Sequence, residues 1–106
     1  MTPKPQIQIT ADALASLGHE ARLSVYRLLV RAGPDGMNVG EITDQLDLPA
    51  STLAHHLKML VHAGLVIQEK RGREVINRPD FDAMNRMLSF LTEECCTGVQ
   101  LRTDAA

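Results

Sequence analysis

Two adjacent cysteines, Cys95 and Cys96, are the only thiols of the chain, and they lie near its C-terminus. Thiolates are soft ligands and suit soft, thiophilic ions. Consecutive residues of a helix point about 100° apart. Both sulfur atoms can still turn toward one ion where the helix frays, and Gly98 soon after the pair favours fraying. The pair therefore predicts a site for a thiophilic ion in a protein whose thiols are normally reduced.

The pair also permits two other interpretations. A free cysteine is commonly a small buried hydrophobe, although two adjacent ones beside Glu93 and Glu94 fit that role poorly. The thiols could instead sense oxidants or reactive sulfur. A disulfide between adjacent residues is strained, so oxidation would favour a bridge between two subunits. The neighbouring acids should raise a thiol pKa and slow that reaction.

A second set of functional candidates lies within residues 50–78, which hold five cations and two anions, whereas residues 80–106 hold two cations and five anions. The formal net charge of the chain is −2, which argues mildly against an indiscriminate nucleic-acid binder. Aromatic residues make up only 3 %, so stacking on single-stranded bases is not the expected binding mode. A basic face on one half of the molecule would both attract and orient a polyanion.

The elements that must position these residues begin with two helices. Residues 1–9 hold two prolines and no helical period, which predicts a loose N-terminal arm. Thr10 can cap a first helix, which Gly18 ends or bends. A second helix is predicted over residues 20–31, with apolar residues at helical spacing, and the turn residues 33–36 follow it.

Two shorter helices with a tight turn between them come next. Asn38 can cap the first, with Glu41 three positions later in a capping-box arrangement. Leu48-Pro49 ends this helix, because the residue before a proline is pushed out of helical geometry, and proline is well tolerated at the start of the next helix. Gly64 ends that helix. Its predicted buried stripe consists of Leu53, Leu57, Leu60 and Val61.

A hairpin and a last helix complete the pattern. Residues 65–67 and 74–76 are β-prone, and residues 70–73 form the turn between them. Asp80 can cap a last helix that is apolar over more than one face. Such a helix needs its own domain and, most simply, a partner subunit to bury against. We expect one domain over residues 1–106, with a flexible tail over residues 97–106.

The chain contains the segments LGHEARLSVYRLL, VGEITDQLDLPASTLAHHLKMLVHAGLV and KRGREVINR. In these three segments it resembles the ArsR/SmtB family of bacterial metalloregulatory repressors. The resemblance covers about residues 14–79. It implies a mostly α-helical winged helix-turn-helix with a small β-hairpin, which dimerises through its first and last helices. It also implies a homodimer that binds double-stranded operator DNA without effector. Such repressors release the DNA when a metal or metalloid binds or, in some members, when thiols are oxidised.

A helix-turn-helix places its second helix in the major groove of DNA, with the wing beside it. Hydroxyls and imidazoles near the start of that helix can reach base edges and phosphates. The wing cations would meet phosphate or the minor groove. An ordinary solvated surface is the alternative for both sets, and His56 lies nearest the buried stripe. The predicted DNA contacts are Ser51, Thr52, His55, His56 and Lys58 in the helix and Lys70, Arg71 and Arg73 in the wing.

The resemblance also bears on the effector. Many arsenic-responsive members carry thiols in the helix before the recognition helix. This chain has VGEITDQL there, without a cysteine. Another group of members carries a Cys-Cys pair at the end of the last helix, usually with a further cysteine nearby. Cys95 and Cys96 match the second group but lack the third cysteine. The implied effector is As(III) or Sb(III), with a third position filled by water, a small thiol or a cysteine of the other subunit. A methylated arsenical needs only two sulfur atoms. No obligatory cofactor is expected, and the last helix has no histidine for the zinc site of other members.

Other functional classes have weaker support. No nucleophile elbow surrounds a serine, and no histidine and acid suggest a catalytic base with its orienter, so we expect no enzyme. No apolar run approaches the roughly 20 residues that span a bilayer. Residues 1–10 also lack the apolar stretch of a signal peptide, so we expect a cytoplasmic protein without a membrane partner. The net charge of −2 also permits a winged-helix module that binds protein rather than DNA.

Overall fold

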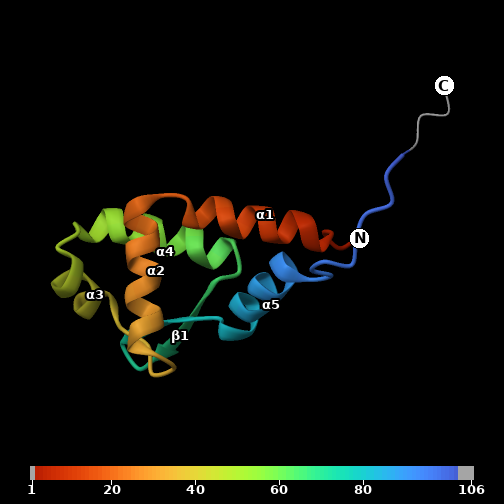
Figure 1. Cartoon of the computed structure of the whole chain (residues 1–106). Coiled ribbons are helices and arrows are strands. Elements are labelled where there is room, and N and C mark those ends of the chain that lie inside the picture. The colour runs from red at the N-terminus through yellow and green to blue at the C-terminus, as the bar shows by residue number, and fades with distance from the viewer. Residues whose placement is uncertain (1, 103–106) are drawn as a thin grey trace.

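The computed structural model describes residues 2–102, which form five helices and one two-stranded hairpin. This is the predicted winged helix-turn-helix, and Figure 1 shows its arrangement. Helix α2 packs against both α4 and β2. The elements are α1 (Gln6–Leu17), α2 (Glu20–Ala32), α3 (Val39–Leu46), α4 (Ala50–His62), β1 (Val66–Arg71), β2 (Glu74–Pro79) and α5 (Phe81–Thr92).

Helix α1 begins earlier than its sequence predicted. Pro5 is extended and stands at the N-cap, and its carbonyl accepts from the Ile9 amide at 3.1 Å. Thr10 is therefore inside the helix, only 3 % exposed, and its hydroxyl accepts from Gln6 Nε2 at 3.2 Å. The expected loose arm is thus wrong for residues 6–9, because nothing after Pro5 breaks the helix. Met1 lies outside the described residues.

The core is aliphatic and joins the helix-turn-helix to α2. Val25 and Leu29 of α2 are fully buried, as is Ile42 of α3. Leu53 and Leu60 of α4 pack into the same cluster. Burial of these side chains fixes the angle at which α4 is presented, because each contributes about 1.5–3 kcal/mol to folding.

The start of α3 has the predicted capping box. Asn38 Oδ1 accepts from the Glu41 amide at 2.8 Å, and the Asn38 amide donates to Glu41 Oε1 at 2.9 Å. After α3 the chain turns through Asp47, whose φ of 52° is left-handed. Pro49 is the N-cap of α4, so the predicted break between the two helices is confirmed.

The wing, defined as β1, β2 and the turn between them, is anchored to the body. Val66 pairs with Pro79 at its base and Arg71 with Glu74 at its tip. Asn77 is fully buried and bridges to Met37, whose carbonyl accepts from Asn77 Nδ2 at 3.2 Å. Gly36 lies so close that a Cβ there would meet the Ile76 side chain at 2.6 Å. The wing therefore has a fixed direction relative to α3.

Helix α5 starts as predicted, because Asp80 Oδ1 accepts from the Ala83 amide at 3.1 Å. Within the helix only Met87 is buried, whereas Leu88 and Leu91 are 52 % and 53 % exposed. Figure 1 places α1 and α5 at the same end of the molecule, away from α3. One apolar face of α5 is thus left open. Residues 97–102 are exposed and form neither helix nor strand, and residues 103–106 of the expected tail lie outside the described part.

Candidate nucleic-acid interface

Helix α4 presents an exposed polar surface beside a buried stripe. Leu53, Leu57 and Leu60 are buried as predicted, but Val61 is 37 % exposed. Four of the predicted contacts are exposed: Ser51, Thr52, His55 and Lys58.

His56 departs from the predicted DNA contacts. Its side chain is only 4 % exposed, and its ring centroid lies 5.1 Å from that of His19. Burial is the main cause that lowers the pKa of His56, and the positive charge of Arg22 adds to it. His56 therefore faces the protein as a neutral ring and is not offered to DNA. The signal was present in the sequence, because residues 53, 56, 57 and 60 have the i, i+3, i+4, i+7 spacing of a buried face.

The N-terminus of α4 is open to an anion. Pro49 is its N-cap, and no side chain accepts from the amides of the first turn. Free amides at a helix start, together with the helix dipole, favour a phosphate. Ser51 and Thr52 lie in this turn, so their hydroxyls and the amides are available to the same group.

The wing carries cations, some of which are already paired. Glu69 Oε2 accepts from Arg78 Nη1 at 2.8 Å and from Arg71 Nη2 at 3.2 Å. The hydrogen bond from Arg71 is the main cause that lowers the pKa of Glu69. Among residues 2–102, no ion pair engages Lys70 or Arg73. The sequence interpretation omitted Arg78 from the contacts, and pairing with Glu69 brings it beside Arg71.

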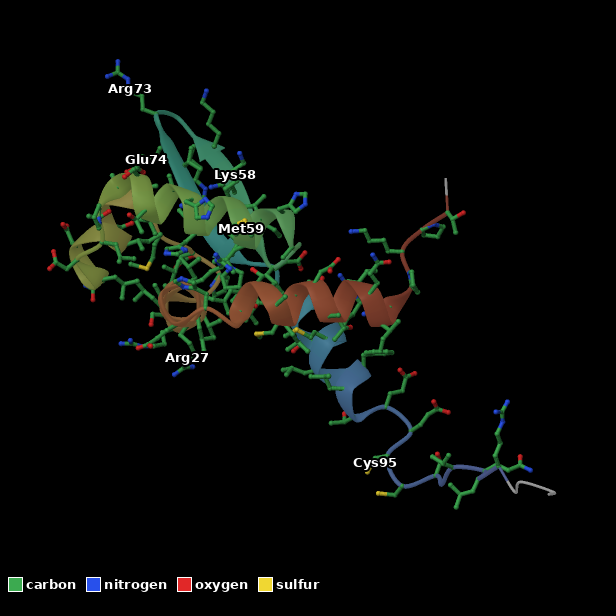
Figure 2. The ribbon with its side chains drawn as sticks, turned by 90° about the horizontal axis from the view of Figure 1, so that it is seen from above. Arg27, Lys58, Met59, Arg73, Glu74 and Cys95 are labelled. Carbon is green, nitrogen blue, oxygen red and sulfur yellow. The ribbon has the colours of Figure 1, made fainter. Side chains whose placement is uncertain are left out.

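Helix α4 and the wing point their cations to one side. Figure 2 shows Lys58 and Arg73 on the same side of the molecule, with Arg27 of α2 on the opposite side. This surface, formed by Ser51, Thr52, His55, Lys58, Lys70, Arg71 and Arg73, is called the basic face below.

Cys95 lies far from Lys58 and Arg73, beyond the end of α5 (Figure 2), and Cys96 is the next residue of the chain. Both are exposed, and their Sγ atoms are 2.7 Å apart without a disulfide. The helix has ended at Thr92, and Cys96 has a left-handed φ of 68°. The thiols are thus outside the helix, which lets both sulfur atoms point to one place. The hydrogen bond between Cys95 and Cys96 raises the pKa of the Cys95 thiol, and desolvation adds to that rise.

Within residues 2–102, no group of three or more His, Cys, Asp or Glu side chains is arranged to hold a metal ion. A single chain offers two thiol ligands, Cys95 and Cys96. No helix in that part is long and apolar enough to cross a membrane.

Known proteins similar to this chain are helix-turn-helix transcriptional regulators. A family model described as a helix-turn-helix domain matches residues 17–69, from the end of α1 into β1. The chain is 34 % identical over 97 residues to the HTH-type transcriptional regulator YbzH of Bacillus subtilis. That match spans 78 % of this chain and 95 % of the relative.

Solved structures of transcriptional regulators are also similar to this chain in fold. An ArsR-like transcriptional regulator from Rhodococcus sp. RHA1 is 26 % identical, with a TM-score of 0.70 over 80 % of this chain and 77 % of that one. A structure described as a "Possible transcriptional regulator for arsenical resistance" is 25 % identical, with a TM-score of 0.66. Its match covers 76 % of this chain and 80 % of that chain.

Proposed function

This chain belongs to the ArsR family of helix-turn-helix transcriptional regulators, and we propose that within this family it is a homodimeric repressor that a thiophilic metalloid releases from operator DNA. The observation that carries the effector is the pair of adjacent, exposed thiols of Cys95 and Cys96 beyond the end of α5.

The basic face supports operator binding. Ser51 and Thr52 lie at an uncapped helix start and present hydroxyls to phosphates or base edges. Lys58 follows on the same helix, and Arg73 projects from the wing on the same side (Figure 2). Helix α4 would enter the major groove while the wing follows the phosphate backbone.

The open faces of α1 and α5 support the dimer. Ile7 and Leu14 of α1 are exposed, as are Leu88 and Leu91 of α5. Large apolar side chains clustered on two neighbouring helices mark an interaction surface. A second copy would cover them with the same patch, and its α4 would read the other half of a near-palindromic operator.

The thiol pair suits As(III) or Sb(III). Thiolates are soft ligands, and binding would displace the thiol protons. Two sulfur atoms from one chain leave a third position of a three-coordinate ion for water, a small thiol or a cysteine of the other subunit. A methylated arsenical would need no third sulfur. The similarity to a structure described as a possible regulator for arsenical resistance agrees with this class of effector.

Release would pass through α5. The cysteines follow its last residue by a few positions, so an ion that fixes both sulfur atoms would reshape the end of the dimer helix. The two α4 helices would then change their spacing or mobility. Coupling of about 1–3 kcal/mol between effector and DNA sites is sufficient for a 5–150-fold change in affinity.

Native mass spectrometry of the reduced protein with As(III) tests this proposal. We expect a dimer that retains arsenic, and a dimer of the Cys95→Ser/Cys96→Ser variant that retains none. A protein that stays monomeric at micromolar concentration, or a double variant that still binds arsenic, would contradict it.

Sensing of oxidants or reactive sulfur is a second candidate, because both thiols are exposed and could form a bridge between subunits. The raised pKa of Cys95 lowers the thiolate fraction and weighs against rapid oxidation. Non-reducing electrophoresis after peroxide would show a covalent dimer if this candidate is right.

A further inference from the structure

A cleft of about 340 Å³ lies between α1, α2 and α4. It is separate from the thiol pair. Its wall includes Lys4 before α1, Asp12 and Ser16 of α1, Arg22 of α2, and Met59 and His62 of α4.

Arg22 is a buried cation with spare hydrogen-bond donors. Its side chain belongs to a residue only 9 % exposed, and Nη1 donates to the Ser16 carbonyl at 3.1 Å. This contact lies at the C-terminal end of α1, where the helix dipole favours a cation. Nε has no partner, and no carboxylate within residues 2–102 forms an ion pair with the guanidinium.

A buried charge without a counter-ion is costly, because the protein interior solvates it poorly. The Ser16 carbonyl satisfies only one of the several N–H groups of Arg22. The Ser16 hydroxyl is also buried and has no partner in the described chain. The wall of the cleft thus contains two buried polar side chains whose hydrogen-bonding capacity is unused.

The rim of the cleft adds further donors. Lys4 and His62 are exposed there, and Lys4 Nζ lies 3.4 Å from Asp12 Oδ2. Asp12 is the one carboxylate in the wall and is already engaged by Lys4. Arg22 therefore lacks a counter-ion among the residues that line the cleft, and a bound anion would supply one.

We propose that this cleft binds an oxyanion of the phosphate class. A guanidinium matches phosphate geometry with parallel N–H donors, and such charge-assisted hydrogen bonds are strong. The volume is at the small end of the range for ligand sites, which suits a phosphate group or a small phosphorylated molecule. The phosphate could belong to a free solute or to the DNA backbone, since both offer the same oxygens.

The position of the cleft gives its occupant a role. A bound oxyanion would touch α1, α2 and α4 together and so hold the DNA-reading helix against α1. By linkage, it would alter operator affinity to the extent that its own affinity differs between free and DNA-bound protein. Binding of an oxyanion in this cleft does not require metalloid sensing at the cysteines.

Phosphate titration followed by NMR of the isotopically labelled full chain tests the proposal. Sodium phosphate is added at constant ionic strength, with sodium chloride as the reference salt. We expect saturable shifts at Ser16, Arg22 and His62. Arg22→Gln should weaken phosphate binding by about tenfold or more, because it removes the charged donor. Arg27→Gln is the matched control, since Arg27 is an exposed arginine of the same helix.

Two further variants keep the test decisive if Arg22→Gln does not fold. Lys4→Gln and His62→Gln change exposed rim residues, and together they should weaken phosphate binding several-fold. The proposal would be overturned if the phosphate shifts do not saturate or if chloride produces the same shifts. It would also be overturned if the shifts persist unchanged in both the rim variants and Arg22→Gln.

Added operator duplex then identifies the source of the phosphate. If a backbone phosphate occupies the cleft, duplex displaces free phosphate, and Arg22→Gln reduces the salt dependence of DNA binding by about one phosphate contact. If a free solute is the ligand, the phosphate shifts persist in the complex. Both results support the site, and they assign its ligand to different sources.

Discussion

Asn38 Nδ2 donates a 2.8 Å hydrogen bond to Glu74 Oε1, which joins the start of α3 to the wing across 36 positions of sequence. Asn38 also caps α3 through its Oδ1 atom. One side chain therefore fixes the helix-turn-helix and the tip of the wing relative to each other.

Asn38→Asp should loosen the wing without damaging α3. Aspartate caps a helix as well as asparagine, but it has no N–H to donate and would repel Glu74. We expect faster motion of residues 70–75 in amide relaxation, with unchanged helix content by circular dichroism. Adding Glu74→Gln should restore the link, because the glutamine amide can donate to the carboxylate introduced at position 38. Equal wing mobility in all three proteins would show that the hydrogen bond does not hold the wing.

Glu69→Gln should increase DNA affinity. Its carboxylate engages both Arg71 and Arg78 in the free protein. Loss of that charge frees the arginines for phosphate, and each new phosphate contact steepens the plot of log affinity against log salt by about 0.9. Binding measured at several salt concentrations checks this. Glu93→Gln beyond α5 makes the same charge change away from the basic face and should leave the slope unaltered.

Lys58→Ala and Arg73→Ala should each weaken DNA binding several-fold at low salt. Both residues are placed on the basic face, and each would lose a phosphate contact with a slope change of about 0.9. Arg27→Ala is the control, since Arg27 lies on the opposite side (Figure 2). An equal loss of DNA affinity in all three variants would show that only the net charge of the protein matters. It would contradict DNA binding by the basic face.

Stability should fall as the pH drops below the ordinary histidine pKa of 6.5, because burial lowers the pKa of His56. A group with a lower pKa in the folded protein binds its proton more readily in the unfolded chain, so acid favours unfolding. Urea denaturation between pH 8 and pH 5 measures this slope. His56→Gln should flatten it. An unchanged slope in His56→Gln would assign the effect to other groups.

Local rules predicted much of the fold. The capping box of Asn38 and Glu41, the break at Pro49 and the cap at Asp80 each depend on residues a few positions apart, and all three are confirmed. Their spacing dictates geometry without reference to the rest of the chain. The exposed residues of α4 follow from the same periodicity.

Features set by distant contacts could not be predicted in this way. The contact of His56 with His19 depends on how α2 and α4 pack together, and the pairing of Arg78 with Glu69 depends on strand register. Arg22 has the i, i+3, i+4, i+7 spacing of a buried face with Val25, Tyr26 and Leu29, but that spacing does not reveal the cleft that Arg22 lines. The partner that would cover the open apolar face of α5 is not part of a single chain. The periodicity of α5 could therefore indicate only that a partner is needed.

The most direct test is a fluorescence-anisotropy titration of reduced protein on DNA from its own promoter, at fixed salt, followed by addition of As(III). We predict tight specific binding that stoichiometric As(III) reverses in the native protein and leaves intact in Cys95→Ser/Cys96→Ser. Binding that ignores As(III), or release that persists in the double variant, would contradict metalloid sensing at the thiol pair. Failure to bind any promoter duplex specifically would contradict the repressor itself.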